Sequence, residues 1–364
     1  MLAESNGFLR PEQVCWCIRT VYTLLLRLSP QEFGALASWQ TLNMESNQLT
    51  SLPSEIGNLT SLQMLNLKDN QLTSLPSDFG NLIILQNLYL SYNRLAFLPP
   101  EIGNLANLQE LHLQGNQLTS LPSNIGNLAN LRFLDFEYNQ LASLPPEIGN
   151  LASLQELKGG YNQLVSLPAE IGNLATLQRL LIDGNQLESL PPEIGNLVNL
   201  EALSLSANQL LSLPPDIRKL ASLFDLNLSD NKLASLPPDI GDIASLEYLN
   251  LFKNQLTSLP PEISSLVTLE SLSLDYNQLK SLPPEIANLE PLSKLYLNDN
   301  HLSGTIPAFI SNLNNLYDLT LFNNPALTCW ETQEALEWAL SLYYYWGPTC
   351  YFSNSIFFPG CYRN

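Results

Sequence analysis

The sequence predicts an α/β solenoid: a curved, horseshoe-like stack of turns with one parallel β-sheet on its concave face and short helical, 3-10 or irregular segments on its convex face. Three observations predict this class. The pattern Leu-x-x-Leu-x-Leu-x-x-Asn-x-Leu, clear at Leu62–Leu72, recurs through most of the chain. Its Asn returns at a nearly constant spacing, and a proline-containing segment follows each copy. A fixed period of about 20 to 50 residues is typical of solenoids and related repeat arrays.

The recurring asparagines define the register of the array. They keep a constant interval, lengthened only before the last copy, and they occur at Asn47, Asn70, Asn93, Asn116, Asn139, Asn162, Asn185, Asn208, Asn231, Asn254, Asn277, Asn300 and Asn324. Each Asn follows the strand, where the chain bends inward. Because a side-chain amide both donates and accepts hydrogen bonds, we expect stacked asparagines to satisfy backbone groups from turn to turn.

Each turn divides into two halves. The alternation in Leu65-x-Leu67 is that of a short strand with one face inward, and successive turns should align these strands in parallel. The returning half, Leu-Pro-Pro-Glu-Ile-Gly-Asn-Leu, favours a short helical or irregular path because proline fixes φ and has no N–H to donate. The Gly of this half is replaced by Arg218, Ser264, Ala287 or Ser311 in four turns, so we expect no special role for it.

These two motifs resemble the leucine-rich repeat superfamily over roughly residues 37–324. Among leucine-rich repeats, the motifs are most similar to the 23-residue class of Ras-suppressor-like, Scribble-like and plant Ras-group-related proteins and of many bacterial repeat proteins. One turn, Ser303-Gly304-Thr305-Ile306-Pro307, resembles instead the repeat of plant extracellular receptors and inhibitors. The resemblance implies the horseshoe fold and a protein-binding role on its concave face, and it implies less about the particular function.

The ends of the chain depart from the repeat. We expect residues 1–46 to hold a capping helix, with an apolar stripe through 14–28, and a degenerate first repeat; residues 47–324 form the array and 325–364 a C-terminal cap. In that cap, Thr328-Cys329-Trp330-Glu331 has the form of a capping box, followed by apolar residues at helical spacing up to Gly347-Pro348.

Composition excludes some partners. The 364 residues carry 15 Lys and Arg against 34 Asp and Glu, a net charge of −19, which is poorly suited to nucleic acid or to anionic lipid. An acidic residue precedes the apolar residue of the returning half in eleven turns, which we interpret as a solvated ridge. No apolar run is long enough to span a bilayer, so we expect no membrane insertion.

Two cellular locations stay open. Arg19 and Arg27 interrupt the hydrophobic stretch near the N-terminus, and acidic residues precede it, which does not fit a secretory signal and favours the cytoplasm. Cys329 and Cys350 flank the C-terminal helix, and a bridge between them would favour an extracellular protein. Cys15, Cys17 and Cys361 complete an odd number of cysteines.

The sequence contains no pattern for catalysis, a cofactor or a metal. Its only histidines are His112 and His301, and it has no Walker loop, dinucleotide fingerprint, nucleophile elbow or paired metal-ligand spacing. Cys15-x-Cys17 fits two buried apolar residues better than a metal site. The segment after Asn324 is too short for an added catalytic domain of the kind found in bacterial repeat effectors.

Binding residues should lie on the exposed face of the sheet, at positions six, four, two and one before each recurring Asn. Turns three to seven combine aromatic rings with mixed charge there, as is typical of binding hot spots. The predicted contact residues are Tyr89, Tyr92, His112, Phe133, Asp135, Tyr138, Lys158, Tyr161 and Arg179. An alternative group is Tyr248, Phe252, Tyr276, Tyr296 and Phe322. Both groups could also reflect the ordinary preference of strands for aromatic residues.

The function that these observations favour is that of a rigid, non-catalytic module that binds a protein partner on its concave face, as a scaffold or adaptor in signalling. Two alternatives remain: an extracellular recognition or defence protein of the plant receptor or inhibitor type, and a structural protein without a specific partner.

Overall fold

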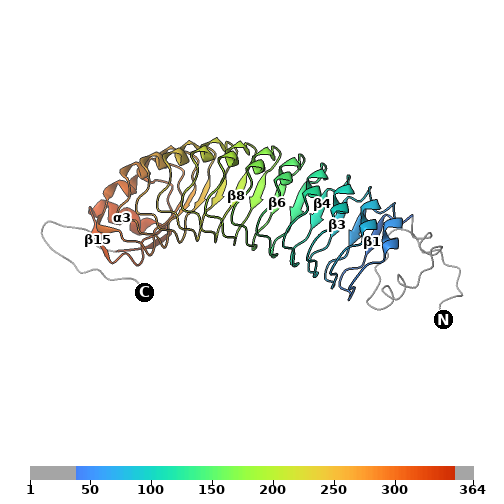
Figure 1. The fold of residues 1–364 in the computed structure, drawn as a ribbon. Coiled ribbons are helices and arrows are strands. Elements are labelled where there is room, and N and C mark those ends of the chain that lie inside the picture. The colour runs from blue at the N-terminus through green and yellow to red at the C-terminus, as the bar shows by residue number, and fades with distance from the viewer. Residues whose placement is uncertain (1–37, 349–364) are drawn as a thin grey trace. The chain divides into compact units, whose positions relative to one another are not determined.

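The computed structural model describes residues 38–348, which form two compact units, residues 38–158 and 159–348. Figure 1 shows each unit as a series of similar turns, with a short strand on one side and a short helical segment on the other. The predicted N-terminal helix and all cysteines except Cys329 lie outside the described residues. The three-part division of the chain therefore stays a prediction.

The strands of the first unit are three residues long and pair in parallel with their sequence neighbours. They are β1 (Thr41–Asn43), β2 (Met64–Asn66), β3 (Asn87–Tyr89), β4 (Glu110–His112), β5 (Phe133–Asp135) and β6 (Glu156–Lys158). The register advances by one full repeat between neighbours, so that Leu88 faces Leu111 and Tyr89 faces His112.

The second unit continues the same arrangement. Its main strands are β7 (Arg179–Leu181), β8 (Ala202–Ser204), β9 (Asp225–Asn227), β10 (Tyr248–Asn250), β11 (Ser271–Ser273), β12 (Lys294–Tyr296), β14 (Asp318–Thr320) and β16 (Tyr344–Trp346). The last of these, β16, follows the array and pairs with β14.

The core lies between the strands and the returning segments. The central leucine of each strand points inward and is buried, as Leu88 and Leu111 show, and so is the apolar residue two positions later, such as Leu90. The flanking strand residues lie on the opposite face and are mostly half-exposed. Alternating strand geometry thus separates a uniform interior from a variable exterior, as predicted.

The returning halves form short 3-10 helices. In the first unit these are η1 (Ser54–Asn58), η2 (Ser77–Asn81), η3 (Pro100–Asn104), η4 (Ser123–Asn127) and η5 (Pro146–Asn150). In the second they are η6 (Ala169–Asn173), η7 (Pro192–Asn196), η8 (Pro215–Lys219), η9 (Pro238–Asp242), η10 (Pro261–Ser265), η11 (Pro284–Asn288) and η12 (Ala308–Asn312). A proline with extended backbone precedes each helix. The predicted solenoid, with a parallel sheet on one side and short 3-10 segments on the other, is confirmed in each unit; the curvature of the whole stack stays a prediction.

The prediction that the Gly of the returning half has no special role is wrong. Its φ is not positive, as expected, but it allows adjacent 3-10 helices to approach closely. A Cβ added to Gly126 would lie 2.5 Å from the carbonyl oxygen of Glu147, and one added to Gly103 would lie 2.4 Å from that of Asn124. The requirement is steric and comes from the neighbouring turn, which a single repeat does not reveal.

The recurring asparagines, which we call the ladder asparagines, are buried and bond to the neighbouring turn from Asn70 on, as predicted, whereas Asn47 is half-buried and donates to Met44 and Glu45 in its own turn. Asn116 is typical: its Nδ2 donates to the carbonyl oxygens of Leu90 in the preceding turn (3.0 Å) and Leu113 in its own turn (2.9 Å). Its Oδ1 accepts a hydrogen bond from the N–H of Leu95 (3.0 Å). One side chain thereby satisfies three buried backbone groups.

The residue before each ladder asparagine adopts a left-handed backbone conformation in every described turn of the array, from Ser46 (φ 56°) to Asn323 (φ 57°). Four of these residues are tyrosines with side chains about half exposed: Tyr92, Tyr138, Tyr161 and Tyr276. Glycine holds the position at Gly115 and Gly184. This conformation is uncommon for bulky side chains. The sharp bend after the strand imposes it, whichever residue is present.

The turn that resembles plant receptor repeats adds a second sheet. Its strand β13 (Ser303–Ile306) pairs in parallel with β15 (Ala326–Trp330) in the next turn. The lengthened interval between ladder asparagines, from Asn300 to Asn324, falls in this same repeat. Its strand β13 begins shortly after Asn300, in a part of the turn that forms no strand elsewhere in the described array.

The predicted capping box at Thr328 is wrong, because β13 offers a strand edge that residues 326–330 join. Helix α3 (Gln333–Ser341) begins later, and the Oγ1 of its N-cap Thr332 accepts a hydrogen bond from the N–H of Ala335 (3.2 Å). The helix also ends before the predicted Gly347, because residues 344–346 form β16. Trp330 is fully buried, and its indole N–H donates to the hydroxyl of Tyr345 (3.0 Å).

Candidate functional site

Four of the predicted contact residues form a continuous row on the outer face of the sheet in the first unit. The ring centroids of Tyr89 and His112 lie 4.6 Å apart in a stacked arrangement, and those of His112 and Phe133 are also 4.6 Å apart. The ammonium of Lys158 lies 5.1 Å from the centroid of the Phe133 ring, within cation–π range. We call Tyr89, His112, Phe133 and Lys158 the aromatic row.

The strand register explains how the row forms. Tyr89 and His112 occupy equivalent positions on β3 and β4, directly opposite each other. Phe133 occupies the first position of β5, where it faces Glu110. Its ring therefore reaches diagonally to His112 and Lys158, as long side chains can across neighbouring strands. All four side chains are half-exposed.

Two glutamates hold the row in place. The hydroxyl of Tyr89 donates to Oε2 of Glu110 (3.1 Å), and the same oxygen lies 3.4 Å from Nε2 of His112. Burial lowers the pKa of His112 although Glu110 opposes this shift, and burial together with Glu110 raises the pKa of Tyr89. Lys158 is paired with Glu156 at 3.2 Å. The row is therefore organised before any partner is present.

Asp135 is buried, which contradicts the prediction that it faces a partner. Its exposed fraction is 7%, and it sits opposite His112 and Lys158 in the strand register. Its Oδ1 accepts a hydrogen bond from the N–H of Glu137 (3.0 Å), and burial raises its pKa above the ordinary value. Asn43 and Asn66 make the same local bond at their turns, so Asp135 has a structural role.

The predicted tyrosines Tyr92 and Tyr138 lie outside the row, at the left-handed position. Their exposed fractions are 46% and 50%. The ring of Tyr92 lies over Gly115, since a Cβ added there would be 2.7 Å from Cδ1 of Tyr92. The ammonium of Lys68 lies 5.7 Å from the same ring. Tyr92 thus has a defined orientation although half of it is accessible.

Tyr161 and Arg179 belong to the second unit. The ring of Tyr161 covers Gly184 in the same manner, and 51% of the side chain is exposed. Arg179 is the first residue of β7 and is exposed. The nine predicted residues therefore comprise the aromatic row, the buried Asp135, two tyrosines beside the row, and two residues of the second unit.

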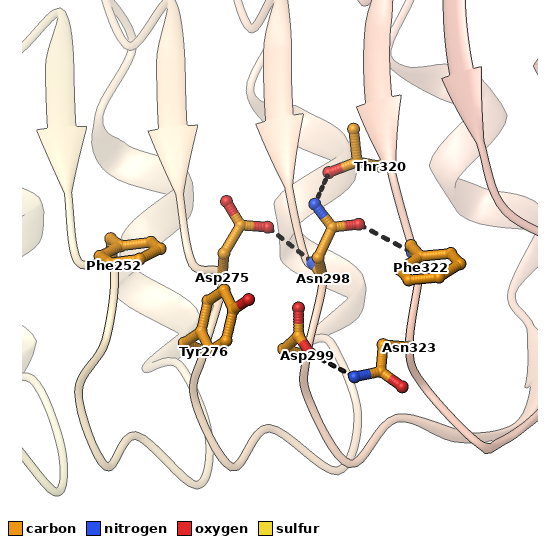
Figure 2. Close-up of a pocket in the computed structure, with 8 residues that line it drawn as sticks. All are labelled: Phe252, Asp275, Tyr276, Asn298, Asp299, Thr320, Phe322 and Asn323. Carbon is orange, nitrogen blue, oxygen red and sulfur yellow. Dashed lines mark hydrogen bonds between the residues drawn. The ribbon is translucent and has the colours of Figure 1, made fainter.

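The second unit contains an open groove of about 700 Å³ at the carboxyl ends of strands β10, β11, β12 and β14, shown in Figure 2. It is lined by Phe252, Asp275, Tyr276, Asn298, Asp299, Thr320, Phe322 and Asn323. Three of the alternative aromatic group line it, whereas Tyr248 and Tyr296 do not. The sequence prediction missed the polar residues, although most of them occupy the positions two and one before the ladder asparagine, beside Tyr276 and Phe322.

In residues 38–348, no group of three or more His, Cys, Asp or Glu side chains is placed to hold a metal ion. None of the helices in that range has the length and hydrophobicity needed to cross a bilayer.

Comparisons with protein families identify repeats along most of the chain. A leucine-rich repeat region model matches residues 23–114, 77–163 and 229–336, and two further leucine-rich repeat models match residues 198–256 and 176–197. A search of curated proteins gives no match.

Among solved structures, a leucine-rich repeat protein of Leptospira interrogans is 40% identical, with 84% of this chain and 83% of that protein covered and a TM-score of 0.69. The PEPR1 receptor crystallised with AtPEP1 is 33% identical over 83% of this chain, with a TM-score of 0.66, and a TDR receptor is 32% identical over 81%, with a TM-score of 0.70. This chain spans 47% and 52% of those two proteins. On its repeats, its fold and these similarities, the chain belongs to the leucine-rich repeat family.

Proposed function

We propose that the chain is a non-catalytic module that binds a protein partner through the exposed face of its sheet, and that the aromatic row is the centre of this contact in the first unit. The observation that carries the proposal is the row itself: three adjoining rings, of which Tyr89 and His112 are stacked, and an ammonium, all placed on the strands. Aromatic side chains of this kind contribute large contact areas at interfaces.

Preorganisation is the proposed mechanism. Glu110 already fixes Tyr89 and His112, and Glu156 already fixes Lys158, so little side-chain entropy would be lost on binding. Tyr92 and Tyr138 lie beside the row and would extend the contact. The buried Asp135 would hold the backbone at the end of β5 through its hydrogen bond from the N–H of Glu137, without touching the partner.

A pull-down from native extract tests the proposal. The intact chain is compared with a variant carrying Tyr89→Ala, Phe133→Ala and Tyr138→Ala, and with the control Phe97→Ala, which removes an aromatic ring that is 55% exposed between β3 and η3. Two or three lost hot-spot contacts should reduce recovery of the partner at least about tenfold. The control should recover it fully.

Equal recovery of one partner by the wild type and the triple variant would exclude the aromatic row as the contact. Failure of the folded wild type to retain any protein specifically would favour the alternative of a structural protein. Far-ultraviolet circular dichroism of all three chains separates lost binding from lost folding.

Within this class, a scaffold or adaptor in signalling is the role that the 23-residue motif favours. The second candidate, an extracellular recognition protein, is favoured by a specific observation: Cys329 is buried and disulfide-bonded. The similarity to PEPR1, which was crystallised with AtPEP1, also supports this candidate. Counting free thiols in protein from its native source distinguishes the two. A free Cys329 supports the scaffold in a reducing compartment, and a blocked one supports the extracellular protein.

A further inference from the structure

The groove of the second unit differs chemically from the aromatic row. Figure 2 shows Phe252 and Phe322 at its two ends, with Asp275 and Asn298 between them. Tyr276 follows Asp275 in the chain and Asp299 follows Asn298, and in this view each lies below the residue that it follows. Three rings and two carboxylates thus border one space, and none of the eight lining residues is a lysine or an arginine.

The rings are accessible. Phe322 and Tyr276 are 59% and 52% exposed, whereas Phe252 is half-buried. Phe252 and Tyr276 meet edge to face with centroids 5.2 Å apart, which leaves the face of at least one ring directed away from the pair. Exposed aromatic faces attract cations through the ring quadrupole, most strongly when the cation is partly desolvated.

Hydrogen bonds hold the polar residues of the groove in place. The N–H of Asn298 donates to Oδ1 of Asp275 (2.7 Å), and Oδ1 of Asn298 accepts from the N–H of Phe322 (2.8 Å). The amide of Asn298 also donates to the hydroxyl of Thr320 (2.7 Å), and the amide of Asn323 donates to Asp299. Figure 2 shows the three bonds that meet at Asn298 and, apart from them, the bond between Asn323 and Asp299. A carboxylate accepts about four hydrogen bonds, so Asp275 and Asp299 retain acceptor capacity for a ligand.

No lining residue of the groove carries a positive charge that could balance the carboxylates of Asp275 and Asp299. Lys253, which precedes the ladder asparagine of its turn, is paired with Asp230 at 2.9 Å and does not line the groove. Burial and the neighbouring Asp299 raise the pKa of Asp275, so a bound cation would relieve a charge that is already poorly solvated. The chain as a whole carries −19.

We propose that this groove binds an arginine side chain of an extended basic segment in a protein partner. The guanidinium would lie against the rings of Phe322 and Tyr276 and donate to the carboxylates of Asp275 and Asp299. Arginine fits better than lysine because its planar group both stacks on aromatic faces and donates to two acceptors at once. A volume of about 700 Å³ accommodates the side chain together with adjacent peptide. The inference rests on the proposed protein-binding function but concerns a different site.

The test uses the full chain and acetylated, amidated tri-arginine peptide, with binding measured by isothermal titration calorimetry at physiological salt. Tri-citrulline, which keeps the shape of arginine without its charge, should bind at least about tenfold more weakly, because charge-assisted hydrogen bonds are about twice as strong as neutral ones. Tri-lysine should bind several-fold more weakly.

Two variants address the site. Asp275→Asn keeps a hydrogen-bond acceptor, and Asn298 already occupies the equivalent position in the next turn, so the fold should tolerate it. Phe322→Ala removes an exposed ring. Each should weaken tri-arginine binding about tenfold, since loss of one partner of a charged pair or of a hot-spot ring has that effect or more.

The matched control is Asp69→Asn, which makes the same charge change at the left-handed position before a ladder asparagine in the first unit. It should leave the affinity within about twofold, because Asp69 does not line the groove and salt screens exposed charges. Equal binding of tri-arginine and tri-citrulline, equal binding of tri-arginine and tri-lysine, or equal effects of Asp275→Asn and Asp69→Asn would overturn the proposal.

The triple variant Tyr89→Ala, Phe133→Ala and Tyr138→Ala, which changes two residues of the aromatic row and one beside it, separates this inference from the proposed function. It should bind tri-arginine like the wild type while it loses the natural partner. Absence of tri-arginine binding to a wild-type chain that still captures its partner would overturn the arginine site alone.

Discussion

The ladder asparagine is the residue on which each turn depends most directly. It satisfies three backbone groups that the bend after the strand would leave unpaired in the interior, as Asn116 does for Leu90, Leu113 and Leu95. Glutamine would be too long for the same geometry, and aspartate would lack the donors. The repetition of Asn therefore follows from hydrogen-bond accounting, independently of any ligand.

Replacing Asn116 by alanine should lower the free energy of unfolding by about 3 kcal/mol or more, because buried groups without partners cost about 1–3 kcal/mol each. Denaturant unfolding followed by circular dichroism measures this. The control Asn130→Ala removes an exposed amide that donates to Ala106, and it should cost less than about 1 kcal/mol. Similar losses in the two variants would contradict the special role of the ladder.

Asp135 shows that a position on the outer face of the sheet is not always accessible. Its column contains both larger, half-exposed side chains and short Asn or Asp side chains that accept a hydrogen bond from the N–H two residues later, as at Asn227 and Asn250. The sequence contained this signal, because Asn or Asp fills that column in several turns. Its meaning depended on the bend that follows the strand.

Asp135→Asn should stabilise the protein at neutral pH, because asparagine makes the same bond without a buried charge. Burial raises the pKa of Asp135 in the folded chain, so the folded state binds the proton more tightly, and the charge becomes destabilising as pH rises from the unfolded pKa of 3.8 through the folded pKa. The stability difference between variant and wild type should therefore be largest near neutrality and vanish toward pH 3. Urea denaturation at a series of pH values measures it. A difference that grows on acidification would contradict this account.

At the scale of elements, the glycines of the 3-10 helices set the spacing between turns on that side of the stack. Gly126→Ala should lower the free energy of unfolding by about 1–3 kcal/mol, the usual cost of overpacking, because the added methyl group meets the carbonyl oxygen of Glu147. Ser264→Ala, at the equivalent position of a turn that already holds a side chain, should change stability by about 0.5 kcal/mol or less. Thermal unfolding of both variants tests this, and a neutral Gly126→Ala would refute it.

The C-terminal helix provides a second test at this scale. Thr332→Ala should destabilise the protein by about 1 kcal/mol, the typical value of an N-cap, because the side chain accepts from the N–H of Ala335. Thr328→Ala removes a hydroxyl that donates to Gly304 at an exposed position in β15 and should have a smaller effect. A larger loss of stability for Thr328→Ala than for Thr332→Ala would contradict this assignment and favour Thr328 as the N-cap, as the sequence pattern predicted.

For the molecule as a whole, the net charge of −19 opposes the compact state through self-repulsion. Salt screens such repulsion over a Debye length that falls from about 10 Å at 0.1 M to about 3 Å at 1 M. The melting temperature should therefore rise with sodium chloride concentration. A variant with Glu55→Gln, Glu101→Gln and Glu147→Gln, which removes three charges from the acidic ridge of the first unit, should gain less from salt. A melting temperature that falls with salt in the wild type would contradict this view.

The fold was predictable because its information is repeated. A constant period, alternating leucines and fixed prolines specify the strand, the bend and the return in every turn. Because the pattern is read from many copies, a substitution in one turn does not obscure it. The predictions that were wrong include two in the C-terminal cap, at Thr328 and at the end of α3, and one in a variable column of the array, the burial of Asp135. In each, a neighbouring strand edge or side chain decided the outcome, and local sequence preference did not.

The candidate sites divide in the same way. The sequence by itself determined the solenoid, the ladder of asparagines and the columns from which contact residues come, because these follow from residue spacing along one chain. Only the tertiary structure decided which members of those columns meet: Tyr89, His112 and Phe133 in one row, and Asp275, Asn298 and Phe322 around one groove. The physical reason is that side chains from adjacent strands, a whole repeat apart in the chain, touch only after the turns have stacked.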